Sequence, residues 1–112
     1  MYPIQQINVP LFNAQSIASS ELSIVQDVSS CVRLCVQAVW SGTSPVGVLH
    51  VQGSNDGIHF NDDPEVTPIA ISGNSGSALV KINNCSYPWL QLSYVFTSGT
   101  GTLSAQVSGK IQ

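Results

Sequence analysis

The stretch CVRLCVQAVW, residues 31–40, places an apolar side chain at every even position. Its odd positions include Arg33 and Gln37 beside two cysteines. Because successive side chains of a strand point to opposite faces, this alternation predicts a strand whose even face lies in a core. The predicted inward residues are Val32, Leu34, Val36, Ala38 and Trp40.

The next segment repeats the pattern, with Leu49 and Val51 inward and His50 and Gln52 outward. The Ser-Asn-Asp-Gly sequence that follows is typical of a tight turn, because Asn, Asp and Gly accept the positive φ angles that such turns need. This strand is therefore predicted to end in a turn at residues 54–57.

Two further alternating runs, residues 89–97 and 103–111, flank the Gly-rich residues 98–101. Two such runs around a Gly-rich connection predict a β-hairpin. The odd positions of the first run, beginning with Gln91, are expected to face outward. The predicted inward residues are Leu90, Leu92, Tyr94, Phe96, Leu103, Ala105, Val107 and Ile111.

Weaker strands are expected at four more places, each bounded by Pro, Gly, Asn or Ser. They span residues 4–9, 22–28, 66–71 and 78–82. Since no stretch has a sustained helical period, the chain is predicted to be all-β, a single antiparallel β-sandwich, with a jelly roll left open as its topology. Residues 1–20 are expected to form an N-terminal arm or first strand, and residues 21–112 the β-sandwich domain.

Charged residues make up 8% of the 112-residue chain, against about 25% in ordinary soluble domains. A polar but uncharged surface suits a protein that packs against copies of itself or a larger assembly. The three Lys and Arg residues are too few to neutralise a run of phosphates, so no nucleic acid is expected as a partner. No apolar run suits a membrane span and no signal peptide pattern is visible, so no membrane is expected and the chain is predicted to be made in cytoplasm.

The cysteines Cys31, Cys35 and Cys85 are odd in number and lack CxxC spacing. Four residues of strand span roughly 13 Å, which is too far for a disulfide between the first two. A bridge from either of them to Cys85 stays open, beside the simpler expectation of reduced, partly buried thiols.

Catalysis is not expected, because a nucleophilic triad needs a Ser or Cys beside a His. The chain offers only His50 and His59, and no GxSxG sequence occurs. The chain is therefore predicted to be no enzyme, and no cofactor is expected.

An acidic cluster follows the predicted turn, and its oxygens are of the kind that Ca²⁺ prefers. The alternative is that these residues serve the backbone geometry of turns. The weak calcium candidates are Asp56, Asp62, Asp63 and Glu65.

Aromatic side chains on a sheet face or loop can contact a neighbouring subunit or stack on sugar rings. Trp40 has inward parity and is predicted to be buried. Trp89 has outward parity, and with Tyr87 it is a candidate for either role, subunit contact being favoured over sugar.

Three segments carry a resemblance to a known class of proteins. Residues 47–60 (GVLHVQGSNDGIHF), 88–94 (PWLQLSY) and 97–103 (TSGTGTL) resemble small β-sandwich structural proteins of tailed bacteriophages and related virions. They are similar, more distantly, to discoidin-type galactose-binding-like domains. This chain lacks the cysteine pair that commonly ties the ends of discoidin domains.

The phage resemblance implies a non-enzymatic virion component assembled in the host cytoplasm. The favoured role is a capsid decoration or cement protein that binds capsid or tail proteins and its own copies. Interface candidates are Tyr2, Phe12, Arg33 and Trp89. The discoidin resemblance implies the alternative, a carbohydrate- or receptor-binding module displayed on a tail or spike.

Overall fold

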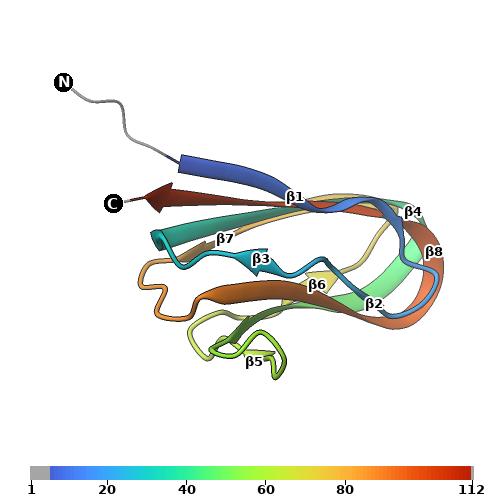
Figure 1. Cartoon of the computed structure of the whole chain (residues 1–112). Helices are drawn as coiled ribbons and strands as arrows, with labels where there is room; N and C mark the ends of the chain where they lie inside the picture. The colour runs from blue at the N-terminus through green and yellow to red at the C-terminus, as the bar shows by residue number, and fades with distance from the viewer. Residues whose placement is uncertain (1–5, 112) are drawn as a thin grey trace.

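The computed structural model describes residues 6–111, which form eight strands and, within that range, no helix (Figure 1). All strand pairs are antiparallel. No helix of this part of the chain is long and apolar enough to cross a membrane. The strands are β1 (Gln6–Ser16), β2 (Glu21–Leu22), β3 (Gln26–Asp27), β4 (Cys31–Ser54), β5 (Asn61–Asp62), β6 (Ile69–Ile71), β7 (Ser75–Ile82) and β8 (Trp89–Ile111).

Strands β4 and β8 form the frame of the molecule, because they pair with each other from the Cys31–Ile111 end to the Ser54–Trp89 end. Both strands bend halfway, so that one continuous sheet folds over into two layers (Figure 1). The upper layer contains β1, residues 102–111 of β8, residues 31–41 of β4, and β7. The lower layer contains the other halves of β4 and β8 with the short strands β2, β3, β5 and β6. The predicted all-β sandwich is confirmed.

The bend is built into the backbone at one corner of the pair. Residues 44 and 45 of β4 stand opposite Gly99 of β8, since Thr43 pairs with Thr100 and Val46 with Ser98. Such a bulge bends the strand that carries the extra residue. Gly99 has a φ of 84°, and a Cβ there would lie 2.1 Å from the carbonyl oxygen of Ser44.

The hairpin predicted for the C-terminal third is therefore wrong. Residues 98–101 do not reverse the chain; they bend the single strand β8 through the corner. Glycine serves a tight bend within a strand as well as a turn between two strands, and local sequence does not separate the two uses.

The predicted inward faces form the core that lies between the layers. Buried members at predicted positions are Leu34, Val36, Ala38, Trp40, Leu49, Val51, Leu90, Leu92, Tyr94, Leu103, Ala105 and Val107. Phe96 is half-buried against this core. The side chain of Ile111 lies outside what the structure describes.

Three predicted orientations are wrong. A register shift between Cys31 and Arg33 turns Cys31 into the core, at 4% exposure, and Val32 out of it, at 39%. Gln91 was expected to be exposed, but its side chain is buried and donates a 2.8 Å hydrogen bond to Gln52. All three cysteines are free thiols, Cys31 buried and Cys35 and Cys85 half-buried.

The N-terminal segment begins as a strand on the edge of the upper layer, where β1 pairs with the last part of β8. Phe12, expected at an interface, is instead 3% exposed within the core of its own chain. Its ring is thus covered by the chain's own packing. Tyr2, the other interface candidate of this segment, lies outside the described residues.

Candidate functional site

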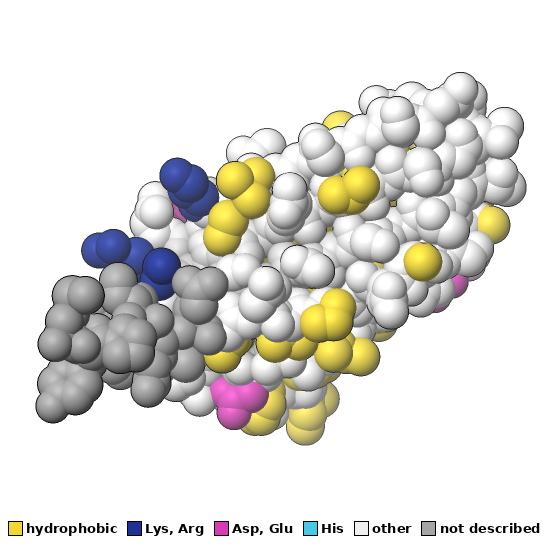
Figure 2. All heavy atoms as spheres, turned by 90° about the horizontal axis from the view of Figure 1, so that it is seen from above, with side chains coloured by type: hydrophobic (Ala, Val, Ile, Leu, Met, Phe, Trp, Pro, Cys, Tyr) yellow, Lys and Arg dark blue, Asp and Glu magenta, His cyan; other side chains and the backbone are white. Residues whose placement is uncertain are grey.

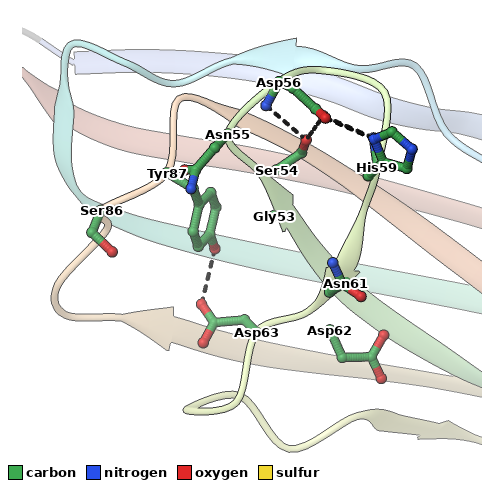
Figure 3. Close-up of a pocket in the computed structure, with 10 residues that line it drawn as sticks. All are labelled: Gly53, Ser54, Asn55, Asp56, His59, Asn61, Asp62, Asp63, Ser86 and Tyr87. Carbon is green, nitrogen blue, oxygen red and sulfur yellow. Dashed lines mark hydrogen bonds and ion pairs between the residues drawn. The ribbon is translucent and has the colours of Figure 1, made fainter.

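A pocket of about 460 Å³ opens at the end of the lower layer, where β4 stops and the loops around β5 begin (Figure 3). Its walls come from two loops that are distant in sequence, one following β4 and one preceding β8. The lining residues are Gly53, Ser54, Asn55, Asp56, His59, Asn61, Asp62, Asp63, Ser86 and Tyr87.

The loop after β4 is held by a turn of side-chain hydrogen bonds. The Ser54 hydroxyl donates to Asp56 Oδ1 at 2.8 Å and accepts the backbone N–H of Gly57 at 3.0 Å. Gly57 has a φ of 77°, the left-handed conformation that the predicted turn required. The sequence prediction of a turn at residues 54–57 is confirmed.

Asp56 is the centre of this turn. Its Oδ1 accepts the backbone N–H groups of Ile58 and His59 at 2.8 Å each, and its Oδ2 lies 2.7 Å from the His59 ring nitrogen Nδ1. The hydrogen bond from the His59 side chain, followed by the two backbone donors, holds the pKa of Asp56 well below its ordinary value of 3.8. Asp56 is therefore ionised at neutral pH.

Tyr87 and Asp63 form the inner wall of the pocket (Figure 3). The Tyr87 hydroxyl donates a 2.9 Å hydrogen bond to Asp63 Oδ2, and the Glu65 backbone N–H donates to Oδ1 at 2.9 Å. Burial raises the pKa of Tyr87 above its ordinary value, and the Asp63 carboxylate raises it further, so the phenol keeps its proton. A Cβ at Gly53 would lie 2.6 Å from the Tyr87 ring, so the ring rests directly on the backbone of β4.

A row of hydrogen bonds crosses the strands beside the pocket. Gln91 donates to Gln52, and Gln52 donates to Asp62 Oδ1 at 3.0 Å. His50 Nδ1 lies 2.8 Å from Asp62 Oδ2. The hydrogen bond from Gln52, and then that from His50, lowers the pKa of Asp62.

Of the four weak calcium candidates, Asp56, Asp62 and Asp63 have carboxylates that are hydrogen-bonded to separate partners. Asp56, Asp62 and Asp63 line the pocket, whereas Glu65 is exposed outside its lining. Residues 6–111 contain no group of three or more His, Cys, Asp or Glu side chains placed to hold a metal ion. The carboxylates of Asp56 and Asp63 accept hydrogen bonds within the loops, and that of Asp62 joins β5 to β4.

Ser54, His59 and Asp56 also meet here, but their hydrogen bonds are arranged differently from those of a nucleophilic triad. The Ser54 hydroxyl donates to Asp56 and not to the His59 ring, which bonds to the same carboxylate. In a triad the histidine takes the proton of the serine, and this requires a direct contact between the two.

The remaining aromatic and interface candidates occupy distinct places. Trp40 is buried as predicted, and its indole N–H donates to the Ser72 carbonyl at 3.0 Å. Trp89 is half-buried and lies against Gly57 of the pocket loop, where a Cβ would be 3.4 Å from the indole nitrogen. Arg33 is exposed on the upper layer, away from this pocket.

Comparison with known proteins supports the fold. No family model and no curated protein matches the chain. The crystal structure of the SPBc2 prophage-derived protein YomS aligns with a TM-score of 0.60 at 11% identity, covering 97% of this chain and 99% of that one. The crystal structure of the PBSX exported protein XepA aligns with a TM-score of 0.64 at 13% identity, covering 95% of this chain and 37% of that one.

These two structures share the fold of this chain, and at such low identity they establish the fold alone. The expected resemblance to β-sandwich proteins of phage origin is confirmed at that level.

Proposed function

We propose that the chain is a non-enzymatic structural protein of a phage particle, which decorates or cements the particle by burying its sheet surfaces against neighbouring subunits. The observation that carries this proposal is a row of aliphatic side chains on the outer face of the lower layer. Val95 of β8 pairs with Val48 of β4, and Val48 pairs with Ala70 of β6.

This row is open to solvent in the single chain. Val95 is 46% exposed and Ala70 is exposed, while Val48 is half-buried. Leu22 of β2 pairs with Ser93, two residues before Val95 on the same face, and is 64% exposed. A contiguous apolar surface on several strands is typical of a protein that binds another protein there.

The outer face of the upper layer agrees with this proposal. Uncharged atoms dominate the view in Figure 2, and the few Lys and Arg side chains gather at one end. Gln37 and Gln106 are cross-strand partners at its centre, with exposed Val39 and Leu79 close by. Away from the end with the Lys and Arg side chains, this face buries little charge on contact, so desolvation opposes assembly only weakly there.

The origin of one structural neighbour supports a phage particle, since YomS is prophage-derived by its description. Within a symmetric particle each modest contact is repeated over many copies, so weak single contacts add up to a stable attachment.

Co-sedimentation with particles of the phage or prophage that encodes the chain tests the proposal. The double variant Leu22→Gln/Val95→Gln should lose sedimentation with particles, and Val32→Gln should keep it. Val32 is a suitable control because it is 39% exposed but lies on the other layer, outside the row. Equal binding of both variants, or no binding of the wild type, would contradict the proposal.

A second candidate function, a carbohydrate- or receptor-binding module on the same particle, is favoured by the pocket at the end of the lower layer. Polar groups there surround the ring of Tyr87. The side chain of Trp89, the first residue of β8, lies close by against Gly57 of the pocket loop. Aromatic rings combined with hydrogen-bonding groups suit sugars. Binding to a glycan array that Trp89→Ala abolishes, without loss of thermal stability, would favour this function.

A further inference from the structure

The cations and most of the acidic residues of the chain lie on two separate surfaces. Its three cations, Arg33, Lys81 and Lys110, all line one depression of about 330 Å³ on the upper layer. Figure 2 shows the dark-blue side chains together at one end of that face. Four of its six acidic residues lie within residues 56–65, at the loops of the lower layer.

Strand register explains the shape of the depression. Cys35 of β4 pairs with Ser108 of β8 on one side and with Lys81 of β7 on the other. Two residues before Cys35 on the same strand, Arg33 pairs with Lys110 of β8. Small side chains thus form the floor and the three long cationic side chains form the rim.

Such an arrangement favours an anionic partner. The cationic side chains of Arg33 and Lys81 are exposed at its rim. They attract an approaching carboxylate, so the depression gains most from a partner that brings several negative charges.

The loop of residues 55–62 has the complementary properties. The side chains of Asp56 and Asp62 are 51% and 48% exposed, and each is ionised at neutral pH. Between them Ile58 is 77% exposed. An apolar contact for this side chain exists beside the depression, since Leu79 on the same face of β7 as Lys81 is 59% exposed.

We propose that the loop of residues 55–62 of one copy binds in the cationic depression of a second copy. The carboxylates of Asp56 and Asp62 meet the cationic rim, and Ile58 packs on Leu79. The two surfaces differ, so the contact is head-to-tail and leaves one of each free for further copies. This contact rests on the proposed assembly role and names a second copy as a partner.

Sedimentation velocity of the purified chain tests the contact. The average mass of the wild type should rise with protein concentration at low salt and fall to that of a single chain at high salt, because salt screens the exposed charges. Lys81→Glu and Asp62→Lys, each alone, should weaken association by about tenfold, since each places like charges together.

A mixture of these two variants gives the decisive result. The Asp62→Lys loop is complementary to the Lys81→Glu depression, and the two unaltered surfaces still fit each other, so mixing should restore association. Glu21→Lys changes net charge as Asp62→Lys does, but it lies on β2, outside both surfaces, and should associate like the wild type.

Cross-linking locates the contact. Ile58→Cys should form covalent dimers and longer species with Cys35 of neighbouring copies under mild copper oxidation in air, and Ile58→Cys/Cys35→Ser should not. A chain that stays single at low salt, or an association that ignores the charge reversals, would overturn the proposal. If the chain stays single and Lys81→Glu abolishes sedimentation with particles, the depression binds another virion protein; unchanged sedimentation leaves the assembly role standing and removes only the contact between copies.

Discussion

The Tyr87 hydroxyl donates a 2.9 Å hydrogen bond to Oδ2 of Asp63, a carboxylate that is only 7% exposed. This contact joins the loop before β8 to the loop after β5, which are 24 residues apart. It therefore fixes the inner wall of the pocket at the end of the lower layer.

Removing the hydroxyl should destabilise the protein. In Tyr87→Phe the buried Asp63 oxygen loses its donor, and an unsatisfied buried polar group costs about 1–3 kcal/mol. Chemical denaturation at neutral pH measures this as a loss in the free energy of unfolding.

Tyr94 provides a matched control for that substitution. Its side chain is 1% exposed, and its hydroxyl has no hydrogen-bond partner among the described residues. Tyr94→Phe removes a buried polar group that gains nothing in the fold, so stability should stay within about 0.5 kcal/mol or increase. Equal losses in the two variants would show that the bond to Asp63 contributes nothing.

Gly53 should not accept a side chain while Tyr87 is present. A Cβ there would lie 2.6 Å from the ring, so Gly53→Ala should lower stability by about 1–3 kcal/mol through overpacking. In a Tyr87→Leu background the same substitution should cost less, because the ring is gone. A double-mutant cycle measured by thermal denaturation checks this coupling.

Acid should weaken the loop that Asp56 organises. The pKa of Asp56 is lower in the folded chain than its ordinary 3.8, so between these two values the unfolded chain binds more protons. The stabilisation is complete above about pH 4 and is lost as pH falls towards the folded pKa. Asp56→Asn should therefore flatten the dependence of unfolding free energy on pH below pH 4, whereas substitution of the exposed Glu65 by Gln should preserve the dependence due to Asp56.

At the corner of the long strands, adding a side chain should destabilise the protein, whereas replacing a residue of positive φ by glycine should be tolerated. Gly99→Ala should cost more than about 1 kcal/mol, because it combines a left-handed φ with a Cβ 2.1 Å from Ser44 O. Ser44, with a φ of 48°, already holds that conformation with a side chain. Ser44→Gly should be neutral or stabilising in the same denaturation assay, since glycine adopts a positive φ without strain.

The period of two in the sequence predicted the fold class and the core, because each buried strand face repeats at alternate residues. It could not locate the corner, since Gly99 and Gly101 satisfy both a turn and a bend. It also assigned Val32 to the wrong face, because a single register shift inverts every orientation beyond it.

The site was predicted in its residue types and not in its connections. Asp56 and Asp63 were recognised as turn residues or metal ligands, but their partners come from loop positions and, for Tyr87, from a distant segment. The cationic depression was missed altogether: Arg33, Lys81 and Lys110 lie far apart in sequence, and only the pairing of three strands brings them together. A hydrophobic pattern carries no information about such pairings.

The pairing of Gln6 with Lys110 has a mechanical consequence. The start of β1 and the end of β8 lie side by side and antiparallel, so a force pulling these two ends apart acts across the ladder and opens its hydrogen bonds one pair at a time. Strand β1 should then peel away at low force, while the long β4–β8 pair remains folded behind it. If two other proteins were attached at these two ends, the force between them would act on the β1–β8 pair. That pair would separate before the force reached the core.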